Sequence, residues 1–207
     1  SVMVVGMNAI LFAFPENAAT AVAFFGVYFK LQSFVFMPVF GLNQGLMPIM
    51  GYNYGARKKH RLNSTTKYGC IIALILMGAG MLVFWLLPRQ LLQIFNASEN
   101  MMAIGIPGLR IISLCFLPAA LGIIASTLFQ AVGKGVNSLL VSLLRQLIVL
   151  LPAAFFLAKL GVVEWVWYAF PIAEVFSLLA SVFLYSRVYN RQIRDLEQDQ
   201  EPVWELK

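Results

Sequence analysis

Four ionisable side chains lie inside long apolar stretches of the sequence: Lys30, Arg110, Arg145 and Glu174. A lone charge at the middle of a bilayer costs about 2.5 to 3.5 kcal/mol on insertion scales, so such groups face the interior of a helix bundle, where they pair or line water. Glu174 is the only carboxylate well inside an apolar stretch. It could bind a proton or attract a cation along a pathway, or it could neutralise a buried base.

Counting about 1.5 Å per residue from the ends of the apolar stretches places Lys30, Arg110 and Glu174 in one layer. The structural interpretation therefore pairs Glu174 with Lys30 or Arg110, which would hold two helices in register. We favour this structural role for Glu174 and keep the pathway role as the alternative.

The composition identifies the surroundings of these charges. Hydrophobic residues form 60% of the 207-residue chain and charged residues 12%, and the mean hydropathy is +0.81, whereas soluble domains carry about 25% charged residues. The apolar residues form long runs along almost the whole sequence. We therefore predict an all-α membrane protein.

Hydrolysis inside a membrane requires a nucleophile with a base, or metal ligands, at membrane depth, and these runs contain neither histidine nor aspartate. The only histidine, His60, lies in a polar connection, and the motifs HExxH, GxSxG and CxxC do not occur. We expect neither an enzyme nor a metal site. Cys70 and Cys115 fall in apolar runs, where small packing residues are expected.

Polar clusters divide the chain into six apolar segments, which we compared with the roughly 20 residues that a helix needs to cross hydrocarbon. The expected spans cover residues 1–14, 18–52, 70–87, 102–131, 138–158 and 163–186, and a polar tail covers residues 187–207. The first span is short, and we expect it to be the end of a helix cut from a longer protein. The pattern predicts a six-transmembrane-helix bundle.

The second span is too long for one straight crossing and carries a cluster of helix-breaking and polar residues. These are Pro38, Asn43, Gln44, Pro48 and Asn53. Each proline removes a backbone donor and frees a carbonyl, which needs a partner from water or a polar side chain. We expect a broken helix beside a polar cavity. The glycine pairs at 41 and 45 and at 51 and 55 would allow another helix to approach closely.

The basic residues predict the orientation. If the spans alternate in direction, ten Lys and Arg residues fall on one side and only Arg89 and Lys159 on the other. The positive-inside rule then makes the first side cytoplasmic, and the C-terminal tail lies on that side. We therefore expect a multi-pass protein of the cell (inner) membrane. The net charge of +6 is thus a topological signal, and we expect no nucleic-acid partner.

Three blocks in fixed order resemble the multidrug and toxic compound extrusion (MATE) family of transporters. They are GLNQGLMPIMGYNYGARKKHR from Gly41, FQAVGKGVNSLLVSLLRQLIVLLP from Phe129, and VWYAFPIAEVF from Val166. The chain is similar to helices seven to twelve, which form one lobe of a 12-helix MATE transporter. Within the family it resembles the bacterial multidrug-exporter branch. The resemblance implies that the N-terminal lobe of the same polypeptide is missing here.

The resemblance also implies a function, which is secondary active multidrug efflux. Such a protein alternates access between two lobes and exports cationic amphipathic compounds in exchange for protons or sodium ions, with no other cofactor. The acidic residues of the family's sodium-linked branch do not carry over, because the first span offers Asn8 and no Asp or Glu lies between Ile104 and Ala131. The coupling ion therefore stays open.

Further polar and apolar residues are candidates for the pathway. Gln130 and Gln146 stand with Arg145 in the family-like blocks, where we expect a hydrogen-bonded clamp between helix ends. An adaptable drug-binding wall or lipid-facing filler could come from Met3, Met7, Met37, Met47, Met50, Phe34, Phe36 and Phe40. Two alternatives to drug export remain, a lipid-linked sugar flippase of the wider superfamily and a non-transport structural or receptor-like membrane protein.

Overall fold

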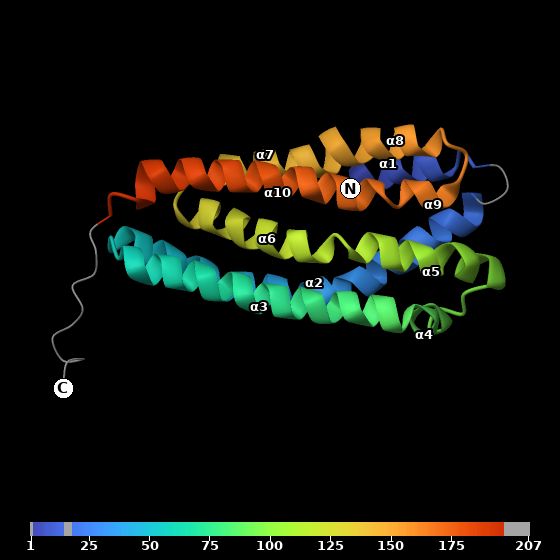
Figure 1. Ribbon diagram of the computed structural model, residues 1–207, viewed down its shortest axis with the longest axis horizontal. Helices are drawn as coiled ribbons and strands as arrows, with labels where there is room; N and C mark the ends of the chain where they lie inside the picture. Colours follow the sequence, from blue (N-terminus) through green and yellow to red (C-terminus); the bar gives the residue numbers. More distant parts are fainter. Residues whose placement is uncertain (1, 15–17, 197–207) are drawn as a thin grey trace.

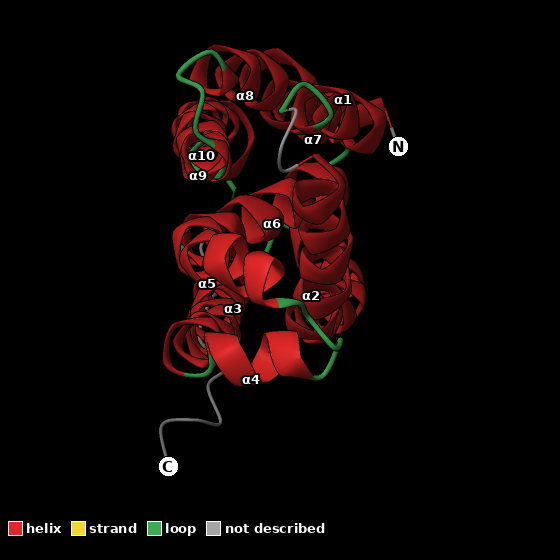
Figure 2. Cartoon of the chain, turned by 90° about the vertical axis from the view of Figure 1, so that its right-hand side faces the viewer, coloured by secondary structure: helices red, strands yellow, loops and turns green. Residues whose placement is uncertain are grey.

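The computed structural model describes residues 2–14 and 18–196, and every regular element in these ranges is helical (Figures 1 and 2). The first three elements are α1 (Val2–Leu11), α2 (Ala18–Gly55) and α3 (Lys59–Leu86). They are followed by the short α4 (Pro88–Gln93) and then by α5 (Glu99–Ser113) and α6 (Phe116–Ala131). The remainder comprises α7 (Gly135–Leu143), the π-helical turn η1 (Leu144–Val149), α8 (Leu150–Ala158), α9 (Val163–Val166), α10 (Ala169–Val188) and the π-helical turn η2 (Tyr189–Ile193).

The prediction of an all-α membrane protein is confirmed. Four segments are long and apolar enough to cross a membrane, namely α2, α3, Gly135–Ala158 and Val163–Ile193, and α5 with α6 makes a fifth if the bent pair is one span. The helix α1 has only 10 described residues, which is too few to cross about 30 Å of hydrocarbon. The described part therefore contains up to five complete spans rather than six. Residues 197–207 of the expected tail lie outside the described residues.

The expected break in the second span is wrong. The helix α2 runs without interruption for 38 residues, or about 57 Å, with Pro38 and Pro48 inside it. Both prolines are exposed on its surface, and each removes one hydrogen bond without breaking the ladder on either side. The polar cluster around them therefore belongs to a continuous wall of the bundle.

The break lies instead between α5 and α6, which meet at 45°. Pro118 explains its position, because proline has no backbone N–H for the carbonyl of Leu114 and its ring crowds that same carbonyl. The last bonds of α5 tighten accordingly, with the N–H groups of Leu114 and Cys115 donating to the carbonyls of Ile111 and Ile112 at 3.2 and 3.0 Å. This bend divides the fourth predicted span near its middle.

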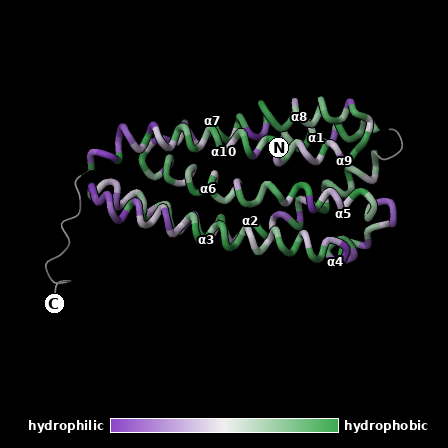
Figure 3. Tube along the Cα trace, in the orientation of Figure 1, coloured by the Kyte–Doolittle hydropathy of each residue, from purple (hydrophilic) through white to green (hydrophobic). Residues whose placement is uncertain are grey.

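The connections of the bundle separate into two ends. The α2–α3 connection, the α6–α7 turn and the end of α10 lie at one end, and the α3–α5 and α8–α9 connections lie at the other (Figure 1). We call the first of these the basic end, after Arg57, Lys58, Lys59, Arg61, Lys134, Arg187, Arg191 and Arg194. Hydrophilic residues gather toward the two ends and hydrophobic residues between them (Figure 3). The alternation of the helices therefore brings the basic connections together, as the sequence predicted.

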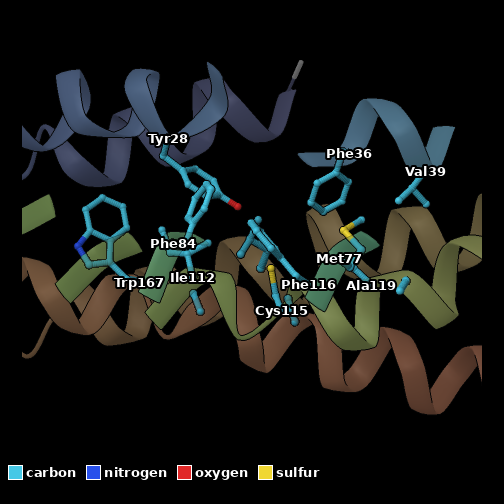
Figure 4. Packing of buried hydrophobic residues seen from close by; sticks show 14 of the residues in the cluster. Tyr28, Phe36, Val39, Met77, Phe84, Ile112, Cys115, Phe116, Ala119 and Trp167 are labelled. Carbon is cyan, nitrogen blue, oxygen red and sulfur yellow. The ribbon is translucent and has the colours of Figure 1, made fainter. Parts of the chain in front are cut away.

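Aromatic side chains join the helices between the two ends. Trp167, fully buried before α10, meets Phe24 of α2 edge to face with ring centroids 5.0 Å apart. Nearer the middle, Phe116 at the start of α6 contacts Phe36 of α2 and Phe84 of α3, at 5.4 and 5.1 Å (Figure 4). Burying an aromatic ring contributes both area and edge-to-face attraction. These contacts join α2 and α3 to α6 and join α2 to the segment that precedes α10.

Close helix packing uses other glycines than those predicted. A Cβ atom at Gly41, Gly45 or Gly55 would meet nothing within 4 Å. On α3, in contrast, a Cβ atom at Gly69 would lie 2.7 Å from Leu46 Cδ1, and one at Gly80 would overlap Val35 Cγ1 of α2. Small residues let membrane helices approach closely, so α3 supplies a close contact with α2, and Gly105 and Gly108 of α5 lie equally close to Phe24.

The Gly80 contact gives a stability prediction. Gly80→Ala should lower the stability by about 1 to 3 kcal/mol, because overpacking against a stiff valine forces the helices apart, and the measurement is thermal unfolding of the purified protein in detergent. Gly78→Ala, two residues away on α3, is the matched control, because its Cβ would make only an ordinary 3.7 Å contact with Leu117. Equal melting temperatures for the two variants would contradict the packing argument.

Candidate functional site

Two cavities of similar size meet inside the bundle. The polar cavity, of about 340 Å³, lies between α2, α6, α7 and α10. The aromatic cavity, of about 350 Å³, lies between α1, α2, η1 and α10. Phe40, Arg145 and Glu174 line both cavities. These three side chains therefore form the partition between a hydrophilic and an aromatic compartment.

An ion pair stands at this partition. Arg145 Nη1 lies 3.4 Å from Glu174 Oε2, at the limit of a hydrogen bond, and it is the one ion pair found among the described residues. The Glu174 side chain is 7% exposed and that of Arg145 is 29% exposed. The carboxylate is thus sheltered, while the guanidinium borders both cavities. A buried carboxylate needs such a partner because desolvation of a single charge is costly.

The predicted partners of Glu174 are wrong. Lys30 is exposed, with its Nζ 5.9 Å from the ring centroid of Phe95, as expected for a long side chain that carries its charge toward the membrane surface. Arg110 is also exposed, and only its backbone carbonyl is engaged, by Trp85 Nε1 at 3.2 Å. Depth along separate helices placed these three residues in one layer, but depth does not define the direction in which each side chain points.

The local backbone explains how Arg145 reaches the partition. Arg145 and Gln146 lie in η1, where the N–H of Leu150 donates to the carbonyl of Arg145, five residues earlier. Pro152 follows and offers no N–H to the carbonyl of Ile148. A π-helical turn inserts an extra residue and rotates the side chains that follow, and such turns are frequent at functional sites. Here both Arg145 and Gln146 face the aromatic cavity.

The polar cavity contains most of the predicted polar residues. Asn43 and Gln44 come from α2, and Gln130 comes from α6. Gln130 Nε2 donates to Ser138 Oγ at 3.1 Å, which links the end of α6 to α7. Asn43 Oδ1 is buried and has no hydrogen-bond partner among the described residues. It is therefore an acceptor available to water or a solute.

Three members of the predicted cluster lie elsewhere. Asn53 is buried at the basic end, and its Nδ2 donates to the carbonyl of Ile49 in its own helix at 2.8 Å. Pro38 and Pro48 are exposed on α2 and line neither cavity. These three residues shape α2 and do not contact the partition.

The aromatic cavity combines ring faces with flexible side chains. Its aromatic residues are Tyr28, Phe29, Phe36, Phe40 and Phe170, and Met3 and Met37 add thioethers. Ring faces attract cations, and thioethers adapt to varied shapes. Of the residues proposed as an adaptable wall, Met47 lines the polar cavity, Met7 and Met50 are buried in the core, and Phe34 is exposed.

Sequence reasoning missed Tyr28 and Phe170. Tyr28 Oη is buried without a hydrogen-bond partner among the described residues, so it offers a donor in the same cavity wall as Glu174. Phe170 lies four residues before Glu174 on α10, and this spacing places both side chains on one face of the helix. That spacing was readable in the block VWYAFPIAEVF. No group of three His, Cys, Asp or Glu residues able to hold a metal ion occurs among the described residues.

The MatE family model matches residues 2–156 of the chain. The multidrug export protein MepA of Staphylococcus haemolyticus is 23% identical over 171 residues, which cover 83% of this chain and 37% of that protein. MepA of Staphylococcus saprophyticus is 24% identical over 165 residues, covering 79% of this chain and 36% of that protein. The chain thus spans less than two fifths of the length of these relatives.

Two solved transporters of the MOP superfamily share the fold. An inward-facing multidrug resistance MATE family transporter aligns with a TM-score of 0.83 and 20% identity over 93% of this chain and 44% of that one. A transporter from Pyrococcus furiosus aligns with a TM-score of 0.84 and 21% identity over 94% of this chain and 44% of that one. The all-helical fold of the described residues agrees with the match over residues 2–156, and the chain belongs to the MatE family.

Proposed function

We propose that the chain is one lobe of a multidrug exporter for cationic amphipathic compounds. The observation that carries this proposal is the sheltered carboxylate of Glu174 at the junction of a polar and an aromatic cavity. The ring faces would accommodate the apolar body of a drug, and the carboxylate would attract its charge. The family membership and the MepA relatives, which are multidrug export proteins, support the same activity.

The ion pair explains how a cation site can be kept in a bundle rich in basic residues. Lys30 and Arg110 line neither cavity, so Arg145 is the one basic side chain beside Glu174. The pair leaves the partition without net charge when no substrate is present. A cationic substrate would compete with Arg145 for the carboxylate, and the partly exposed guanidinium could turn toward the polar cavity.

Transport would require a second lobe and a coupling ion. The exposed face of α2 carries large apolar side chains at Phe34, Met37 and Met47, and the glycines at 41 and 45 have open space beside them. Such a face fits the N-terminal lobe of the same polypeptide, against which this lobe would rock to alternate access. The counter-transported ion is a proton or a sodium ion, and Glu174 is the candidate carboxylate that this lobe offers for it.

A second candidate is export of an anionic, lipid-linked sugar. Arg145 lines both cavities, and a guanidinium is suited to phosphate. The Pyrococcus furiosus protein is described as a transporter in which reverse polarity of the binding pocket suggests a different function. Drug export remains the first candidate because the carboxylate is the more deeply buried partner and the adjoining wall is aromatic.

We also infer the orientation from the basic end. The bulk of the Lys and Arg residues lies there, so the positive-inside rule makes this end cytoplasmic in the inner membrane. The polar cavity, which lies beside the α6–α7 turn, would then open toward the cytoplasm. The aromatic cavity would lie deeper in the bilayer.

The carboxylate of Glu174 gives the central prediction. In cells without their own efflux pumps, Glu174→Gln in the full-length protein should reduce ethidium export at least tenfold at normal membrane abundance, because the cation loses its counter-charge. Glu164→Gln, at the opposite end from the basic connections, is the matched control and should export normally. Unchanged export by Glu174→Gln would refute the proposal, and movement of lipid-linked sugar without drug export would favour the second candidate.

A double variant separates function from packing. Arg145→Gln should destabilise the protein by about 1 to 3 kcal/mol, since it leaves a sheltered carboxylate without its base and the partial exposure of Arg145 moderates the loss. The combination Arg145→Gln with Glu174→Gln should regain much of the melting temperature yet remain inactive in ethidium export. Recovery of export together with stability would show that Glu174 acts only as a counter-ion.

The orientation can be tested by thiol labelling in intact cells. With Cys70 and Cys115 replaced, a cysteine at Lys159 should react with a membrane-impermeant maleimide from outside. A cysteine at Arg57 should react only after the membrane is permeabilised. The opposite pattern would invert the proposed topology.

A further inference from the structure

A small pocket of about 220 Å³ lies at the basic end, between the start of α7 and the end of α10. Lys134 enters it from the α6–α7 turn, and Arg187 and Arg191 enter it from α10 and η2, one turn apart. Two amide side chains, Asn137 and Gln192, complete its polar wall. The pocket thus collects three cations and two amide groups, and α7 and α10, between which it lies, are neighbours in the bundle (Figure 1).

This arrangement of charge calls for an anion. Among the described residues no acidic side chain lines the pocket, and the ion pair found in that part of the chain lies elsewhere, at Arg145 and Glu174. Like charges closer than the Debye length of about 8 to 10 Å repel one another, and a bound anion removes that repulsion. The positive-inside rule accounts for basic residues at this end, but it does not account for their convergence with two amides on one concave site.

The depth of the pocket indicates which anion it binds. The face of α10 that precedes it is apolar and exposed at Leu179, Val182 and Phe183, and the pocket begins where this apolar stretch ends. Leu184 forms its wall on the side toward the middle of the helix. The basic groups therefore lie at the level of the lipid headgroups, with an apolar surface directly beneath them.

We propose that this pocket binds the phosphate of an anionic phospholipid of the phosphatidylglycerol class. The guanidinium groups of Arg187 and Arg191 can each present two donors to phosphate oxygens. The amides of Asn137 and Gln192 can bond the glycerol hydroxyls. Basic pockets between membrane helices on the cytoplasmic side bind such headgroups. The inference goes beyond drug export and does not depend on it.

The test uses the full-length protein after its lipids have been removed in detergent. The protein is titrated with phosphatidylglycerol or phosphatidylcholine, and native mass spectrometry counts the lipids that it retains. Phosphatidylglycerol should be retained in preference to phosphatidylcholine. The variant K134Q/R187Q/R191Q should weaken its binding on the order of 100-fold, at about fivefold for each basic group near an anionic lipid. The variant R187K/R191K keeps the charge, controls for folding, and should lose less than tenfold.

A matched control removes the same charge elsewhere at the basic end. R57Q/K58Q/R61Q, in and next to the α2–α3 connection, should leave the retained phosphatidylglycerol nearly unchanged, and an equal loss there would overturn the proposal in favour of general surface attraction. Displacement of the lipid by millimolar inorganic phosphate would make the pocket a site for free anions. A third outcome is that the unmodified protein retains no phosphatidylglycerol but binds it once the acidic residues after Leu196 are neutralised. That result would make the acidic segment, and not a lipid, the native occupant of the pocket.

Discussion

The attraction between Arg145 and Glu174 is what lets this apolar bundle keep charge at membrane depth. A lone charge there costs about 2.5 to 3.5 kcal/mol, while opposite unit charges about 4 Å apart attract by about 4 kcal/mol at an effective dielectric constant of 20. Two separate charges would cost about 5 to 7 kcal/mol, so the attraction offsets more than half of that cost, and the partial exposure of Arg145 lowers the cost further. Its 3.4 Å separation is long for a charged hydrogen bond.

The surrounding elements follow from the need to hold this pair. The π-helical turn η1 turns Arg145 and Gln146 toward α10, and α10 presents Glu174 beside Gly122 of α6. A Cβ atom at Gly122 would lie 3.8 Å from Glu174 Oε1, an ordinary contact. Phe40 of the unbroken α2 completes the partition. A polar and an aromatic compartment are therefore kept apart by three side chains from three helices.

Sequence reasoning predicted the fold class and the key carboxylate for clear physical reasons. Long apolar runs can only be accommodated in lipid, and a single acidic residue within them must be sheltered, so Glu174 was identifiable. Its partner was not, because spacing along a helix gives depth but the rotation of each helix about its axis is set by packing. The extra residue in η1 shifts that rotation at Arg145 itself.

Prolines show the same limit. Pro38, Pro48 and Pro118 each remove one backbone donor, yet only Pro118 coincides with a break between helices. The first two lie on the exposed surface of α2, a continuous helix that packs against α3 and α6. Tyr28 and Phe170 were missed for a related reason, because 14% of the chain is aromatic and ring content alone cannot separate a cavity wall from filler.

The length of α2 has a mechanical consequence. At about 57 Å it exceeds a hydrocarbon layer of about 30 Å, so part of the helix lies beyond the hydrocarbon. The same helix carries Phe40 and Asn43 in the cavity walls. Because α2 is one continuous element, a change in its tilt would reach both compartments together.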